Sequence, residues 1–136
     1  AIPGCRAPRF IGDMPHTWVG AGFIQSLRAM FAYEREADQA LVLAAGVRPS
    51  WIAAGTGVRG LPTHFGTLDF TMEEAGADAV RVRIGGQIAP PPGGIVVSSP
   101  FARPLVGVRI DGEDVAVAAT DCVVVRKVPV EIELRQ

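Results

Sequence analysis

Chemistry in this chain would depend on few residues, since the sequence holds no H-E-x-x-H, G-x-S-x-G, P-loop or G-x-G-x-x-G motif. One of its two histidines, His16, lies between Asp13 and Trp18 in a proline-containing segment that is typical of a helix start. An indole ring can stack on the face of a sugar, and an imidazole can hydrogen-bond its hydroxyl groups. We therefore predict that Asp13, His16 and Trp18 contact a carbohydrate.

Structural interpretations of the same residues stay open. Asp13 can cap the free backbone N–H groups of the helix, and His16 and Trp18 can be ordinary packed residues. The other histidine, His64, stands at a predicted strand entrance and is interpreted as structural. Trp51 lies in a predicted loop, where we interpret it as a cover over the core rather than as a sugar platform.

Pairs of carboxyl groups are of interest because glycoside hydrolysis uses two of them. Asp13 is one candidate, and Glu34 with Glu36 near the end of the predicted helix is another. We interpret Glu34 and Glu36 as part of a solvated face that includes Arg35 and Asp38. The catalytic residues therefore remain unassigned.

The sequence predicts neither a metal site nor a cofactor. Its two cysteines, Cys5 and Cys122, form no C-x-x-C motif, and Cys122 beside a run of valines is predicted to be a core residue. With 13 basic and 14 acidic residues and no basic run, the chain is not expected to bind nucleic acid. No apolar stretch reaches the roughly 18 residues that a membrane span needs.

One helix is predicted, from Thr17 to Glu36, because its apolar residues recur at helical spacing. These residues are Val19, Phe23, Ile24, Leu27, Met30 and Phe31. An amphipathic helix must bury such a stripe, and the following strands alone offer it too little surface. We therefore expect the face formed by Val19, Phe23, Leu27 and Met30 to contact a partner chain or the remainder of a larger polypeptide.

Strands are predicted for the rest of the chain, with 46–66 as a long connection. The segment 40–45 is a short apolar strand, and the segments 67–73 and 80–84 alternate apolar and polar residues. A three-residue turn at 75–77 would use Gly76 in a left-handed conformation and would set Asp69 opposite Arg83.

Asp111-Gly112 is the strongest hairpin signal, and a two-residue turn there sets Val108 opposite Val115. Together the pattern predicts a mainly β protein, an antiparallel β-sandwich of about seven or eight strands preceded by one amphipathic α-helix. Residues 1–38 are expected to hold a lead-in and the helix, and residues 39–136 the β-sandwich.

The order of these features resembles the C-terminal end of (α/α)6-barrel glycoside hydrolases, α-L-rhamnosidase-like enzymes in particular. The last barrel helix of these enzymes begins with a short His-containing motif, to which the segment 13–18 is similar. Their chain then enters a β-sandwich through a segment similar to T-P-Y-G, and Pro62-Thr63-His64-Phe65-Gly66 looks like a variant with Pro and Thr exchanged. The segments 92–96 and 111–112 are similar to the end of such sandwiches in bacterial proteins that carry discoidin-type modules. The resemblance covers roughly residues 13–135.

The resemblance implies a C-terminal, largely non-catalytic segment of a multidomain carbohydrate-active protein, in which the sandwich stabilises the catalytic barrel. Of the residues in this chain, it would place His16 and Trp18 at the rim of the active site, and the catalytic carboxylates in helices outside this chain. Two alternatives stay open. One is a stand-alone carbohydrate-binding sandwich with a tryptophan as the stacking platform, and the other is a structural or assembly domain without a ligand.

Overall fold

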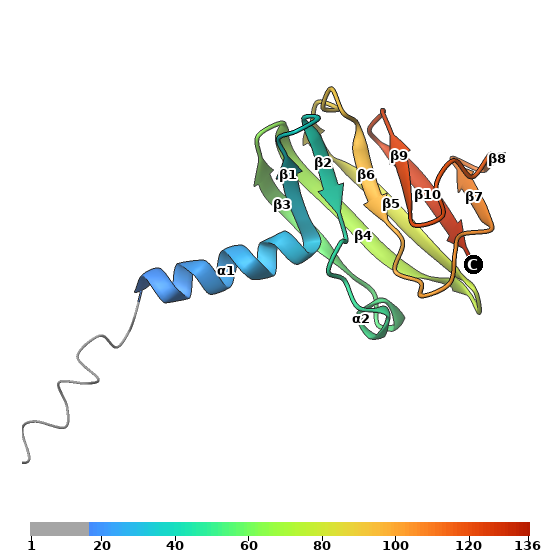
Figure 1. The fold of residues 1–136 in the computed structure, drawn as a ribbon, viewed down its shortest axis with the longest axis horizontal. Coiled ribbons are helices and arrows are strands. Elements are labelled where there is room, and N and C mark those ends of the chain that lie inside the picture. Colours follow the sequence, from blue (N-terminus) through green and yellow to red (C-terminus); the bar gives the residue numbers. More distant parts are fainter. Residues whose placement is uncertain (1–16) are drawn as a thin grey trace, which may run out of the picture.

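The computed structural model describes residues 17–136 of the chain and confirms the predicted fold class. Helix α1 (Thr17–Phe31) projects from a sandwich of two sheets, which lie one behind the other in Figure 1. The described residues contain ten strands rather than seven or eight, together with a short second helix, α2 (Pro49–Ala53). The strands are β1 (Ala32–Arg35), β2 (Ala40–Leu43), β3 (Thr56–Thr63), β4 (Gly66–Gly76), β5 (Ala79–Ile88), β6 (Ile95–Ser98), β7 (Gly107–Ile110), β8 (Glu113–Val115), β9 (Cys122–Val125) and β10 (Val130–Arg135).

The two sheets differ in size and in strand direction. The six-stranded sheet has the order β3-β4-β5-β10-β7-β8 and all its pairs are antiparallel. The four-stranded sheet has the order β1-β2-β6-β9, and its central pair, β2 with β6, is parallel. That parallel pair is the exception to the antiparallel arrangement that the sequence predicts.

The core lies between the sheets and is filled by the inward side chains of both. Leu68, Phe70 and Met72 of β4 are buried, as alternation in that strand requires. The last strand alternates as predicted, with Val130, Ile132 and Leu134 buried and the charged residues Glu131, Glu133 and Arg135 more accessible. In the four-stranded sheet, the core-facing residues include Leu41, Leu43, Ile95 and Val97.

The two predicted hairpins have different outcomes. Asp111 and Gly112 both have positive φ, at 48° and 87°, and Val108 faces Val115, so the two-residue turn is confirmed. The predicted register of β4 with β5 is wrong by two residues: Asp69 lies opposite Gly85 rather than Arg83. The chain turns at residues 77–78, after a bulge between Glu74 and Gly76, rather than at 75–77. Because the register differs from the predicted one by an even number of residues, the apolar side chains still lie on the same face.

The connection predicted over residues 46–66 is wrong, because it contains α2 and the edge strand β3. The β3 pairing with β4 is interrupted between Val58 and Leu61, and its glycines and its proline hide the strand pattern. The helix also ends five residues earlier than predicted. Ala32–Arg35 instead forms β1, and Ala44 and Gly46 donate hydrogen bonds to the carbonyls of the last two helical residues.

A search of the described residues for a helix long and apolar enough to cross a membrane finds none.

Candidate functional site

Helix α1 carries a large share of the exposed apolar side chains in the described structure. These side chains are Val19, Phe23, Ile24 and Leu27, which are 49%, 70%, 66% and 44% exposed. Large apolar side chains that are gathered on one element and left in water mark an interaction surface. Three residues of the predicted contact face therefore lie open, whereas the fourth, Met30, is half-buried against Gly46. We call the four exposed residues the α1 apolar face.

The rest of α1 is also unusual for a solvated helix, because Arg28 is the one charged residue between Thr17 and Phe31. Ser26 donates its hydroxyl hydrogen bond to the Gly22 carbonyl of the same helix, at 2.9 Å. A surface helix normally carries charged residues on its solvent side. The composition of α1 therefore suits a helix that is packed against other elements.

The last turn of α1, by contrast, is anchored to the sandwich. The ring of Phe31 stacks on Trp51 of α2 with centroids 5.9 Å apart, and it lies 6.4 Å from the ring of Phe70 in the core. Trp51 packs partly buried against the core, which confirms its interpretation as a cover. A Cβ on Gly46 would lie 2.8 Å from the Met30 side chain, so only glycine allows the chain to pass this close to the helix.

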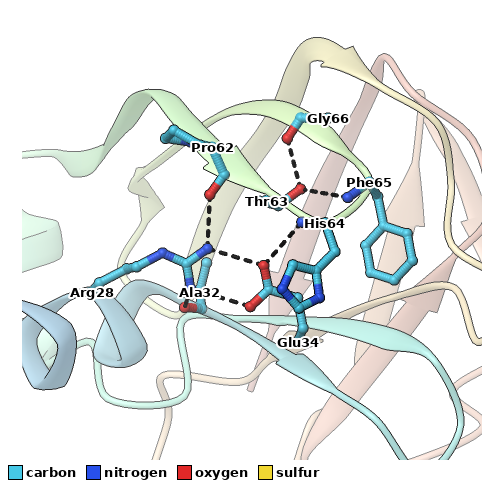
Figure 2. A network of polar contacts seen from close by, with 8 residues as sticks. All are labelled: Arg28, Ala32, Glu34, Pro62, Thr63, His64, Phe65 and Gly66. Atoms are coloured by element: carbon cyan, nitrogen blue, oxygen red, sulfur yellow. Dashed lines mark hydrogen bonds and ion pairs between the residues drawn. The ribbon is translucent and has the colours of Figure 1, made fainter.

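An ion pair completes the anchor (Figure 2). The two terminal nitrogens of Arg28 donate to the two carboxylate oxygens of Glu34, at 3.0 and 3.2 Å. The same guanidinium donates to the carbonyl of Pro62 at 2.8 Å and to that of Ala32 at 3.3 Å. The backbone N–H of His64 donates to Glu34 at 3.2 Å. Arg28 and Glu34 thereby join α1, β1, the end of β3 and the β3–β4 turn.

The electrostatics of this junction, formed by Arg28, Glu34, Pro62 and His64, favour the ionised form of the Glu34 carboxyl group. Partial burial acts to raise the pKa of Glu34, but the hydrogen bonds from Arg28 and from the His64 backbone outweigh it, so that pKa is lowered. The Glu34 side chain is only 14% exposed, so its predicted place on a solvated face is wrong. The predicted solvated neighbours fit better: Glu36 is exposed, and Arg35 pairs with Asp38 in the exposed turn, at 2.7 Å.

A shallow depression of about 490 Å³ lies over this junction. It is lined by Gln25, Arg28, Glu34, Pro62, Thr63 and His64. The arginine and the carboxylate already bond to each other and to the backbone, which leaves the Gln25 amide and the His64 imidazole as its open polar groups. Among the described residues, no group of three His, Cys, Asp or Glu side chains could hold a metal ion. The arrangement is suited to holding elements together rather than to catalysis.

The structure describes only one of the predicted carbohydrate contacts. Asp13 and His16 fall outside the described residues, and Trp18 belongs to the first turn of α1. At 1.5 Å per residue, Trp18 is about 15 Å along the helix axis from Arg28. Trp18 and the junction thus lie at opposite ends of α1. His64, interpreted from the sequence as structural, contributes its backbone N–H to the junction.

Comparison with protein-family models, with characterised proteins and with solved structures gives no match for this chain.

Proposed function

We propose that this chain is the C-terminal, largely non-catalytic segment of a multidomain carbohydrate-active protein of the glycoside hydrolase type. In this proposal α1 is the last helix of a helical barrel formed by other residues, and the β-sandwich packs on that barrel and stabilises it. The observation that carries the proposal is the α1 apolar face, which has no covering element among the described residues.

The energetic gain from covering this face is substantial. Full burial of one large apolar side chain contributes roughly 1.5–3 kcal/mol. The four side chains are already about half covered, so burying the remainder adds about 1 kcal/mol each, or about 4 kcal/mol in all. That is a sizeable part of the net stability of a typical domain, which is about 5–15 kcal/mol.

Acid/base hydrolysis of the glycosidic bond is assigned in this proposal to carboxyl groups of the barrel. A general acid in such a reaction needs a raised pKa, so that it is protonated at neutral pH. Glu34 has the opposite property, since its pKa is lowered by Arg28 and the His64 backbone. Glu34 therefore suits the junction rather than the reaction.

A stand-alone carbohydrate-binding sandwich is the second candidate, and the position of Trp51 argues against it. One face of this indole is stacked on Phe31, and the ring packs against the core. Trp18 then remains as the tryptophan for a sugar platform. A structural or assembly domain without a ligand is the third candidate, and it shares the docking of α1 but no contact with sugar.

Hydrogen exchange in two contexts tests the proposal. We expect the natural protein that carries this sequence to be much longer than 136 residues, and the backbone amides of α1 before Arg28 to exchange more slowly in it than in the 136-residue chain. Amides of β4, in the sandwich core, serve as the internal control and should exchange alike in both. A natural protein of this length, or equal exchange of α1 in both contexts, would contradict the proposal. Binding of the 136-residue chain to a glycan array, lost in Trp51→Ala or in Trp18→Ala, would support the second candidate instead.

A further inference from the structure

Strand β9 (Cys122–Val125) ends the four-stranded sheet and has an open edge. Its one strand neighbour among the described residues is β6, and its other side pairs with no strand (Figure 1). An edge strand presents free backbone N–H and C=O groups, and proteins commonly protect such edges with charges, prolines or bulges. Apart from its short length β9 has none of these features, because it consists of a cysteine and three valines.

The other three edge strands are protected. β3 contains Pro62, and its register with β4 is interrupted. β8 has three residues, of which Glu113 and Asp114 are acidic. β1 follows α1 directly, and its Glu34 accepts a hydrogen bond from the backbone of His64 in the β3–β4 turn. This contrast identifies β9 as the edge that is open to pairing.

The ladder with β6 determines which backbone groups of β9 point outward. The N–H of Ser99 donates to the carbonyl of Asp121 at 2.8 Å, in continuation of the β6–β9 register. Hydrogen-bonded and non-bonded pairs alternate along an antiparallel ladder, so the next residue that bonds to β6 is Val123. Cys122 and Val124 therefore direct their N–H and C=O groups to the open edge, where no described strand meets them. Another extended strand supplies donors and acceptors at the matching spacing.

The charges on either side of β9 suit a second copy of the same strand. Asp121 stands three positions before Val124, and Lys127 stands three positions after it. Antiparallel pairing centred on Val124 sets Asp121 of each copy opposite Lys127 of the other, whereas parallel pairing would set like charges side by side. Asp121 is exposed and has no ion-pair partner among the described residues, and Lys127 has only an exposed contact with Asp111.

The same charges select the register. Opposite side chains in an antiparallel pair lie on the same face, so a symmetric pairing can be centred on any one of the three valines. Centred on Val123, it would set Asp121 opposite Val125, which is 4% exposed, and would place a carboxylate beside a buried apolar side chain. Centred on Val125, it would set Lys127 opposite Val123, which packs against the core. The pairing centred on Val124 matches valines with valines and opposite charges with each other.

We infer that β9 pairs antiparallel with β9 of a second copy of this chain, about a two-fold axis at Val124, so that two four-stranded sheets join into one continuous sheet. The pairing satisfies the open N–H and C=O groups of Val124 and covers its side chain, which is 46% exposed. It involves far fewer than the roughly 20–30 residues per side of a stable interface, so the association is weak. The inference uses the sandwich alone and does not depend on the proposed function.

Sedimentation velocity of the 136-residue chain, from about 10 μM to about 1 mM, tests the inference. Every chain carries Phe23→Glu, which suppresses contacts through the α1 apolar face, and a reductant prevents disulfides between copies. Val124→Lys and Val124→Glu each bring two like charges together at the two-fold axis, and we expect each to weaken the dimer roughly tenfold. Mixed in equal amounts, these two variants bring opposite charges together and should recover the dimer. Val19→Lys, at a valine of α1 that is 49% exposed, is the matched control and should change nothing.

Three outcomes would overturn the inference. If the chain with Phe23→Glu alone stays monomeric at the highest concentration, β9 does not pair with itself, and its edge is left to a strand of another protein. If Val124→Lys and Val19→Lys weaken the dimer equally, the contact lies away from β9. If the mixture of Val124→Lys and Val124→Glu fails to dimerise although circular dichroism shows both variants folded, the two-fold pairing at Val124 is wrong.

Discussion

The two ends of helix α1 differ in nearly every contact they make. In the last turn, the side chains of Arg28, Met30 and Phe31 are ion-paired, packed or stacked against the sandwich. From Val19 to Leu27 the large apolar side chains are exposed, and the helix that carries them leads away from the two sheets (Figure 1). Contacts within the described chain therefore explain only the last turn. The large apolar side chains of the earlier turns find no covering element among the described residues.

A matched pair of truncations sharpens this comparison most. Phe31→Ala removes a ring that touches Trp51 and lies close to Phe70, so we expect the 136-residue chain to lose about 2–4 kcal/mol of unfolding free energy. Phe23→Ala makes the same chemical change at a side chain that is 70% exposed and should cost less than about 0.5 kcal/mol. Urea denaturation monitored by circular dichroism measures both. Equal losses would mean that the first turns of α1 pack within this chain.

The ion pair of the anchor gives the next largest effect. Glu34→Gln keeps the shape of the side chain but removes the charge that Arg28 and the His64 backbone contact, and we expect a loss of about 1 kcal/mol. Glu36→Gln, two residues further on at an exposed position, is the control and should be close to neutral. If the Glu34→Gln variant is as stable as the control, the ion pair contributes nothing to the anchoring of α1.

Acid should release the same contact. Because the folded-state pKa of Glu34 lies below its ordinary value, the carboxylate contributes stability above that ordinary value and loses it as the pH falls through the folded pKa. The stability difference between the unmodified chain and Glu34→Gln should therefore be largest near neutral pH and should shrink on acidification. Denaturation curves at a series of pH values measure it. A difference that grows towards acid pH would contradict the lowered pKa.

The smallest effect is expected on the charged face of the six-stranded sheet. Glu73→Gln removes a partner of Arg81 and Arg83, but the pairs are exposed and screened, so we expect a loss below about 0.5 kcal/mol. The loss should fall further at about 1 M salt, where charges are screened over roughly 3 Å. A larger loss that salt does not reduce would mean that this face is covered.

Much of the sandwich could be predicted because local signals and packing agree there. Alternation in β4, β5 and β10 reflects burial on one face, and Asp111-Gly112 meets the two positive φ angles of its turn. The signals failed where tertiary pairing overrides local preference. Residues 32–35 continue a helical pattern, but pairing with β2 makes them a strand. In β3, the glycines and the proline suit an interrupted edge strand and read as a loop.

The candidate site was predictable only in part. The α1 apolar face follows from helical spacing, and its exposure was expected because the strands offered no matching surface. The bond between Arg28 and Glu34 could not be read from the sequence. The two residues are six apart, which is no neighbour spacing on a helix, and they meet because the chain leaves the helix at Phe31. The direction of the chain after Phe31 depends on the pairing of β1 with β2 and on the contact of Glu34 with the β3–β4 turn.

The parallel pair of β2 and β6 has a consequence for how the chain folds. Leu41 faces Ile95, 54 positions further along the sequence (95 − 41), whereas β4 and β5 meet across a turn at Gly76 and Ala79. Closing the longer loop costs more chain entropy, and such distant contacts form slowly. Between β2 and β6 the chain builds three strands of the other sheet. The six-stranded sheet can therefore begin as a local meander of β3, β4 and β5, and the pairing of β2 with β6 follows later. During that interval the valine-rich segments that become β6 and β9 lack the strands with which they pair in the folded protein.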